Sequence, residues 1–303
     1  MLGISTVWKS GAVKEGQKLL ECFTKLGFEN IELEYRISDG TYREIKQCLK
    51  ENGSLKISSI HNFFPIPEIT EEGGADVFLL SSENKEERAL AVKYTIKTMQ
   101  IAAELEAKAV VVHLGMVPMD TVKTELFGLY DNGKTGSDEH KKMLKEFKIL
   151  REGRKGKTFD MLLMSIDEIV KATEKLGVHI GIENRYYLRE YPDVDEIGVI
   201  FEKFGNEQIG YWHDVGHAKV QENLGITRPN QLLETYGRFL IGVHLHDVNG
   251  YSDHHVPGMG EVDFDLLKKY LKSDTIKILE IHPRESEKDL MDGVNFLKAI
   301  GLD

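Results

Sequence analysis

The chain has 303 residues, of which 41% are hydrophobic and 29% are charged, so it is long enough and apolar enough to bury one large core. Its formal net charge of -11 disfavours binding to nucleic acid or an anionic membrane surface, and no apolar run approaches the ~20 residues of a membrane-spanning helix. Cys22 and Cys48 are too few for a disulfide framework, and the N-terminal residues lack a basic leader with an apolar run, so we expect a cytoplasmic protein with reduced cysteines.

Short β-rich runs alternate with amphipathic helical patterns along the whole chain, which predicts a parallel sheet. The predicted strands are Leu2–Val7, Asn30–Glu34, Lys56–His61, Lys108–His113, Val178–Glu183, Gln208–Asp214, Leu240–His246 and Thr275–Ile281. Eight strand–helix units favour a closed (β/α)8 barrel over an open doubly wound sheet. No glycine-rich phosphate loop follows the first strand, which argues against a dinucleotide-binding fold. We therefore expect residues 1–303 to form a single α/β barrel domain.

The connection between the fourth and fifth strands is unusually long. Residues 114–177 separate them, roughly twice the length that one helix and its loops need. We therefore predict an inserted helical segment at about residues 117–158, above the C-terminal rim of the barrel. Its run KKMLKEFKILREGRKGK is the most basic part of the chain, and it suits either a solvated helix face or contact with an anionic substrate.

Polar residues lie at the C-terminal ends of most predicted strands: His61, His113, Glu183, Asp214, His244, His246 and Glu280. Because side chains alternate along a strand, their apolar neighbours face the helices, and polar residues such as Glu183, His244 and Glu280 face the barrel axis. Barrel enzymes place their chemistry at this end. In the stretch GYWHDVGHA, Asp214 faces inward and His217 follows in the turn above it, whereas His213 points outward and is predicted to be structural.

A single strand-end histidine or glutamate is more often a satisfied polar group than a ligand, and His140, His179 and His282 are interpreted in that way. Several carboxylates and imidazoles that converge on one cavity are different, because they would repel and desolvate one another without a cation. A divalent metal resolves that conflict. Mixed carboxylate and imidazole ligands suit Mn²⁺, Zn²⁺, Co²⁺, Fe²⁺ or Mg²⁺.

Five stretches are the most specific parts of the sequence: GIENR at 181–185, HDVGHA at 213–218, GVHLHD at 242–247, DHHVPGMGEVDF at 253–264 and LEIHP at 279–283. With them, nearly the whole chain resembles the xylose isomerase-like TIM barrel superfamily, which contains sugar phosphate isomerases and epimerases and the apurinic endonuclease family 2 proteins. The resemblance to the sugar enzymes implies one metal held by Glu183, Asp214, His244 and Glu280. It also implies that His217 lies near the substrate and that the two glutamates exchange protons with a carbon next to a carbonyl.

The nuclease branch of this superfamily uses a larger ligand set for three metals. The matching residues are His61, His113, Glu183, Asp214, His217, His244, His254 and Glu280. Asp253 directly precedes His254, whereas the nucleases separate the aspartate from this histidine by one residue, so the sequence leaves the third metal open. The epimerases of free ketohexoses carry an arginine soon after the seventh-strand histidine, and the stretch HDVNGYSDHH offers none.

The sequence thus predicts a divalent-metal-dependent isomerase or epimerase of a small sugar or sugar-derived substrate. The residues near the substrate or a second metal are predicted to be His61, His113, His217, His246 and His254. A metal-dependent phosphodiester hydrolase of the apurinic endonuclease type and a lyase acting on a keto-sugar are the alternatives. Pro257, Gly258 and Gly260 predict a turn that either brings His254 over the cavity or is merely structural. The expected partner is a small-molecule substrate. The sequence leaves open whether the chain forms a homo-oligomer.

Overall fold

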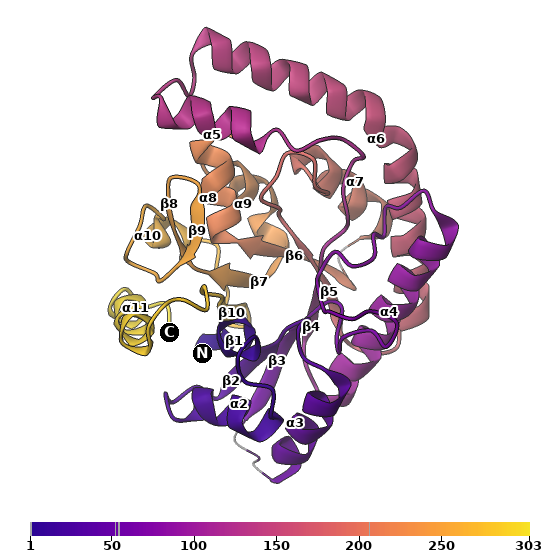
Figure 1. Cartoon of the computed structure of the whole chain (residues 1–303), viewed down its shortest axis with the longest axis vertical. Helices are drawn as coiled ribbons and strands as arrows, with labels where there is room; N and C mark the ends of the chain where they lie inside the picture. The colour runs from indigo at the N-terminus through magenta and orange to yellow at the C-terminus, as the bar shows by residue number, and fades with distance from the viewer. Residues whose placement is uncertain (1, 52, 54, 206) are drawn as a thin grey trace.

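The strands of the chain close into a barrel. The structure is a computed structural model that describes residues 2–51, 53, 55–205 and 207–303. Parallel strands follow one another in the order β1-β10-β7-β6-β5-β4-β3-β2, with helices around the outside (Figure 1). Their bounds are β1 Leu2–Ser5, β2 Asn30–Leu33, β3 Lys56–His61, β4 Ala109–Val112, β5 His179–Glu183, β6 Ile209–Asp214, β7 Leu240–Leu245 and β10 Ile276–Leu279. This confirms the predicted (β/α)8 TIM barrel.

Several helices begin at side chains that cap their free N–H groups. Asn84, Ser137, Asp193 and Ser286 each accept a hydrogen bond from the backbone N–H three residues further on. The helices are α1 Val7–Ser10, α2 Gly16–Thr24, α3 Asp39–Glu51, α4 Lys85–Glu104, α5 Lys123–Asp131, α6 Asp138–Thr173, α7 Val194–Phe204, α8 Val215–Asn223, α9 Gln231–Tyr236, η1 Gly237–Phe239, α10 Phe264–Leu267 and α11 Glu287–Ala299. Within the described residues, no helix is both long and apolar enough to cross a membrane.

The long connection after β4 folds as two helices, α5 and α6. Helix α6 has 36 residues and continues through position 158, where the sequence placed the end of an insertion. In Figure 1 its first half extends beyond the barrel, and its second half packs beside α4. The connection after β4 is thus helical over Lys123–Asp131 and Asp138–Thr173. That residues 117–158 are an insertion relative to other barrels stays a prediction.

The basic run lies on α6 and is mostly solvated, with Lys141 and Lys145 exposed. Arg151 is different, because it is only 2% exposed. Its guanidinium pairs with Glu196 at 2.7 Å and Asp193 at 2.8 Å, so its buried charge is compensated and α6 is tied to the start of α7. Contact between the basic run and an anionic substrate stays a prediction.

The lower part of the barrel interior is filled by a small apolar cluster of Ala109, Val111, Trp212 and Ile278. The large indole fits because neighbouring strands present glycines to it. A Cβ atom added at Gly242 would lie 2.1 Å from Cζ3 of Trp212, and one added at Gly181 would lie 3.1 Å from Cε3. The cluster fills the barrel interior below the polar strand ends.

Gly242→Ala is expected to destabilise the protein by about 1–3 kcal/mol, because the added methyl group overpacks the Trp212 ring. Chemical denaturation measures this free energy of unfolding. Gly153→Ala in α6 is the matched control, since a Cβ there meets nothing within 4 Å. Equal stability of the Gly242 variant and the wild type would show that the barrel interior has spare room.

Candidate metal centre

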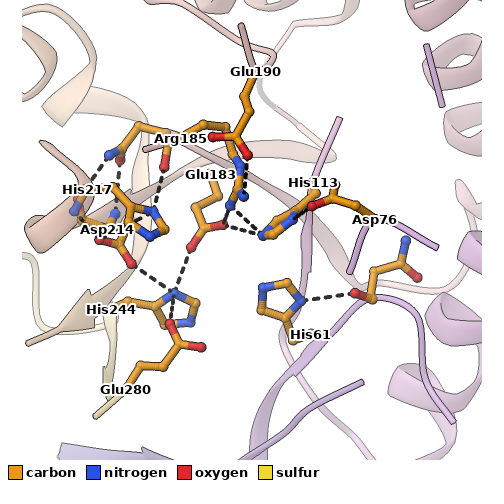
Figure 2. A network of polar contacts seen from close by, with 12 residues as sticks. His61, Asp76, His113, Glu183, Arg185, Glu190, Asp214, His217, His244 and Glu280 are labelled. Carbon is orange, nitrogen blue, oxygen red and sulfur yellow. Dashed lines mark hydrogen bonds and ion pairs between the residues drawn. The ribbon is translucent and has the colours of Figure 1, made fainter. Parts of the chain in front are cut away.

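Side chains from four neighbouring strands meet at the C-terminal end of the barrel. Glu183 ends β5, Asp214 ends β6, His244 lies near the end of β7, and Glu280 directly follows β10. All are buried, and one ligand-type atom from each lies within 4.8 Å of the others. Figure 2 shows the three carboxylates pointing toward the imidazole of His244. The structure thus brings together the residues that the sequence grouped around one metal.

The two ring nitrogens of His244 have different surroundings. Nε2 lies 3.1 Å from Oε1 of Glu32, which accepts a hydrogen bond from the Nε2–H group. Nδ1 lies 2.9 Å from Glu183, 3.1 Å from Glu280 and 3.7 Å from Asp214. Ionised carboxylates only accept hydrogen bonds, so a bare Nδ1 lone pair facing three of them is repulsive unless positive charge lies between them. Three carboxylate groups and one imidazole therefore fit a divalent cation.

The pKa values reflect the same concentration of charge. Burial alone would lower the pKa of His244, but the carboxylates of Glu280 and Glu32 outweigh burial and hold this pKa well above its usual value. Burial would likewise raise the pKa of Glu183, but hydrogen bonds from His113 and His244 hold it well below its usual value. Burial would raise the pKa of Glu280 too, but the charges of His244, His254 and His61 together outweigh burial and lower it. Both glutamates are therefore ionised at neutral pH.

A second group consists of His61, His113 and Glu183. Nδ1 of His61 lies 3.0 Å from the backbone carbonyl of Asn62, and Nδ1 of His113 lies 3.1 Å from Oδ2 of Asp76. These oxygens favour the tautomers with the proton on Nδ1, so Nε2 of each ring is the acceptor, and Nε2 of His113 is contacted by the guanidinium of Arg185. Nε2 of His113 lies 3.0 Å from Oε2 of Glu183. His61 therefore has the tautomer that a metal or a substrate hydroxyl would require, whereas His113 would have to exchange its contact with Arg185 for such a ligand.

The third group lies on the other side of Asp214 and includes His217 and His254. Nδ1 of His217 lies 3.3 Å from the carbonyl of Asn184, and Nδ1 of His254 lies 2.9 Å from the carbonyl of Glu280. Oδ2 of Asp253 lies 3.6 Å from Nε2 of His217 and 3.8 Å from Nε2 of His254. The carboxylate of Asp253 thus reaches both rings, although its place in the sequence differs from the nuclease pattern.

His246 is close enough to this group to be counted with it, but its hydrogen bonds give it another role. Nδ1 of His246 accepts the backbone N–H of His254 at 2.9 Å, so Nε2 carries the proton and donates it to Asp214 at 2.9 Å. Neither nitrogen has a free lone pair. The ring fits against Gly216, where a Cβ would lie 2.0 Å from Cε1 of His246. His246 therefore orients Asp214 and is not placed to bind a metal.

The histidines that the sequence interpreted as structural lie elsewhere. His213 is buried, and its Nδ1 is 2.7 Å from the hydroxyl of Tyr211; burial lowers its pKa to about 4. His140 contacts the backbone carbonyl of residue 224, and His282 accepts the backbone N–H of residue 284. His179 starts β5, at the opposite end of the strand from Glu183.

Glu32 was not identified as a site residue in the sequence. It is fully buried, contacts Nε2 of His244 and accepts a hydrogen bond from Ser59 at 2.7 Å. The alternation of side chains along the strand could have identified it: Ile31 and Leu33 are apolar and face the helices, so Glu32 between them faces the barrel axis.

Arg185 is the second residue that the sequence analysis missed, although it lies in the stretch GIENR. Its guanidinium donates to Glu183 at 2.7 Å and to Glu190 at 3.2 Å, and it lies against Nε2 of His113. Figure 2 shows it between these groups, with Asp76 on the far side of His113. The position of the Arg185 side chain cannot be predicted from strand periodicity, because Arg185 lies beyond the end of β5.

Comparison with known sequences identifies the fold family. A model of the family described as xylose isomerase-like TIM barrel matches residues 23–300. An uncharacterized protein of Methanocaldococcus jannaschii is 27% identical over 196 residues, which cover 62% of this chain and 55% of that protein. The matched part of the chain thus spans about half the length of this curated relative.

Solved structures show the same fold at low sequence identity. A D-tagatose 3-epimerase-like protein superposes with a TM-score of 0.69 at 20% identity, covering 99% of this chain and 96% of that chain. A 3-keto-D-glucoside 4-epimerase from E. coli has a TM-score of 0.69 at 15% identity, with 98% of each chain covered. A Thermus thermophilus protein soaked with ZnCl2 has a TM-score of 0.62 at 21% identity, covering 99% and 96%.

Proposed function

The chain belongs to the xylose isomerase-like TIM barrel family, and on that premise we propose that it is a divalent-metal-dependent isomerase or epimerase of a small sugar or sugar-derived substrate. In this proposal the cation is held by Glu183, Asp214, His244 and Glu280. Glu183 and Glu280 also transfer the proton between substrate carbons or between the two faces of one carbon.

The arrangement of three carboxylates around Nδ1 of His244 is the observation that carries this proposal. One proton on Nδ1 offsets one of the three negative charges, whereas a divalent cation offsets two and also accepts the nitrogen lone pair. When bound, such a cation stabilises the negative charge that develops on the oxygens of a ketose or aldose. The remaining steps fall to the side chains of the chain itself.

Glu183 and Glu280 differ in how tightly they are held. Oε1 of Glu183 contacts His244, and its Oε2 contacts Arg185 and His113. Oε2 of Glu280 contacts His244, while its Oε1 accepts no hydrogen bond within the described part of the chain. Glu280 is thus better placed to remove a proton from the carbon next to the carbonyl, which gives an enediolate. The enediolate then regains a proton either from the carboxyl group that Glu280 has become, at the neighbouring carbon, or from Glu183 on the other face after Glu183 has taken a proton from solvent. The proton count balances, and the reaction involves no net oxidation.

The solved structures that share the fold support this substrate class. Two are named for the epimerisation of sugars, and a third was soaked with zinc chloride. The polar groups converge at the C-terminal ends of the strands, where TIM-barrel enzymes have their active sites. Together these points favour proton transfer on a polyhydroxylated small molecule.

A metal-dependent phosphodiester hydrolase is the second candidate. It is favoured by the group of His61, His113 and Glu183, and by the contact of Asp253 with His217 and His254. These groups flank the first and could hold further cations, an arrangement suited to phosphoester cleavage. A lyase acting on a keto-sugar would use the proton chemistry of the first candidate.

Metal stoichiometry and hydrogen exchange separate these candidates. The protein is purified without chelator, its metal is measured by elemental analysis, and sugars, sugar phosphates and a phosphodiester are then incubated with it in D2O. About one ion per chain, with deuterium incorporated at a carbon of a sugar, supports the isomerase or epimerase. Two or three ions with cleavage of the phosphodiester and no carbon exchange would replace it with the hydrolase.

Glu32→Gln is expected to lower the affinity for the divalent cation by about 10–100-fold, because the Nε2 proton of His244 loses its carboxylate partner. Competition with a chromophoric chelator measures this affinity. Glu104→Gln on the outer helix α4 is the matched control, since its partners Lys46 and Tyr42 lie outside the barrel. An unchanged affinity in the Glu32 variant would show that the carboxylate does not act on His244.

A further inference from the structure

A short hairpin forms one wall of the candidate site. Strands β8 (Asp247–Asn249) and β9 (Ser252–His255) pair in antiparallel fashion directly after β7. The hairpin carries Asp253 and His254, whose side chains face His217. Since these side chains come from a loop rather than a barrel strand, their positions depend on whatever fixes the loop.

Asp247 at the base of the hairpin gathers the backbone of the loop around its carboxylate. Oδ1 accepts the N–H groups of Val248 at 2.9 Å and Val262 at 3.0 Å, and Oδ2 accepts those of Gly258 and Gly260 at 2.9 Å each. The carboxylate is 1% exposed. A buried side chain that accepts hydrogen bonds from four N–H groups within a stretch of fifteen residues fixes the path of that stretch strongly.

The glycines of the loop are needed for this arrangement. Gly258 has a φ of 89°, a conformation that other residues rarely adopt. A Cβ added at Gly260 would lie 2.5 Å from Oδ1 of Asp247 and 2.3 Å from the carbonyl of Val248. The stretch VPGMGEV therefore wraps closely around the carboxylate.

His254 itself is held in an unusual backbone conformation, with a φ of 56°. Its backbone N–H donates to Nδ1 of His246, and its carbonyl accepts the N–H of His282 at 2.9 Å. Its ring stacks on His246 with centroids 4.1 Å apart. This conformation persists only if the rest of the hairpin is fixed.

The tip of the hairpin is held by helix α5. The ring of Tyr251 stacks on Phe127 with centroids 3.9 Å apart and planes 5° apart, and its hydroxyl donates to Asp131 at 3.1 Å. Helix α5 therefore holds the tip from outside, while Asp247 holds the base from inside.

We propose that Asp247 is a positioning residue, which fixes the β8–β9 hairpin so that Asp253 and His254 face His217 across the site. It touches no substrate or metal and acts through the loop. Its consequence for turnover rests on the proposed function, whereas its effect on the hairpin does not.

The test compares Asp247→Asn with the wild-type full-length chain. Amide deuterium exchange across residues 248–262 is expected to become at least about tenfold faster, the effect of weakening hydrogen bonds to a charged group. Exchange at imidazole C2 should also become faster for His254, while His61 on the other side of the site keeps its rate. Asp263→Asn, the cap at the end of the same loop, is the matched control and should change neither rate.

Gly260→Ala disturbs the same carboxylate from an exposed position and guards against a folding defect of the first variant. It should reproduce both exchange effects, whereas Gly153→Ala should not. Unchanged hairpin exchange in the Asp247 and Gly260 variants would overturn the proposal. Equal acceleration throughout the barrel strands would also overturn it, because it would indicate a general role in stability.

Turnover supplies an independent readout. For a sugar that exchanges hydrogen with solvent, Asp247→Asn should lower kcat/KM by about 10²-fold, the effect of a small misplacement of site groups. It should add little to His254→Ala, since both changes act through the same side chain. If the double variant lowers kcat/KM by the product of the two single effects, the two residues act independently and the proposal is overturned. If no sugar exchanges hydrogen, the proposed function fails, but the amide and imidazole exchange rates still decide the role of Asp247.

Discussion

Replacing Glu280 by Gln is expected to lower the rate of solvent deuterium incorporation into the substrate by about 10²–10⁴-fold, the usual contribution of a positioned general base. Gln retains the size of the side chain and an oxygen that can accept a hydrogen bond, but it cannot take a proton. Oε2 of Glu280 lies 3.1 Å from Nδ1 of His244, so the change also removes one negative charge from the metal centre. The rate must therefore be measured at saturating metal.

Glu183→Gln should lower the rate of deuterium incorporation by a similar factor, but it should reduce the free energy of unfolding more than Glu280→Gln does. Glu183 is 1% exposed and shares Arg185 with Glu190. Removing its charge leaves the buried guanidinium with one carboxylate partner, and a broken buried pair is destabilising. Chemical denaturation should therefore show a greater loss of stability for Glu183→Gln than for Glu280→Gln.

Glu104→Gln serves as the control for both changes, because it makes the same substitution on the outside of the barrel. If one of the two variants keeps the wild-type rate of hydrogen exchange at saturating metal, the glutamate replaced in it is not the base. If both keep it, the assignment of the acid–base pair is wrong even if the metal assignment stands.

The strand-end residues could be predicted because a barrel strand has a period of two and only one inside face. That rule placed Glu183, His244 and Glu280 together, and the structure has them within a few ångströms of one another. The same rule identifies Glu32, which lies between Ile31 and Leu33. Glu32 lies deeper in the barrel than the residues at the strand ends, which is where polar groups of barrel enzymes are expected.

The role of His246 could not be predicted in the same way. Alternation gives it the same inward direction as His244, so both resembled ligands. The difference depends on the backbone N–H of His254, which reaches Nδ1 of His246 only because the hairpin folds back. Such a contact follows from tertiary structure, and strand periodicity contains no information about it.

The bounds of helix α6 were also set by tertiary contacts. Gly153 and Gly156 lie in its interior and are unfavourable in helices. The helix nevertheless continues, because Arg151 pairs with Glu196 and Thr158 contacts the hydroxyl of Tyr191 at 2.7 Å. Packing outweighs local propensity here.

Asp214→Asn is expected to reduce the affinity for the divalent cation by more than about 100-fold. Loss of a residue that only hydrogen-bonds to a metal ligand already costs up to about 100-fold, and Asp214 is itself a proposed ligand. The substitution removes the charge, and with Oδ1 kept it places an amide NH2 where Oδ2 lies, 3.7 Å from Nδ1 of His244, so this position can no longer offer a lone pair to a cation. Elemental analysis after dialysis and competition with a chelator measure the affinity.

The fold should survive this change, because Asp214 has a separate structural role that Asn can fill. Its Oδ1 caps helix α8 by accepting the backbone N–H of His217 at 2.6 Å, and Asn is as good a cap as Asp. Asp263→Asn, which also replaces a capping aspartate, provides the matched control and should keep the wild-type metal content.

Thermal unfolding adds a readout that is independent of activity. A cation at 100 times its Kd stabilises the folded state by about 2.7 kcal/mol, so added metal should raise the Tm of the wild type. The same concentration should leave the Tm of Asp214→Asn nearly unchanged, because it lies at or below the weakened Kd. If the variant keeps full metal content and the same rise in Tm, the cation is held elsewhere. Glu183, His244 and Glu280 would then be a buried polar network without a metal.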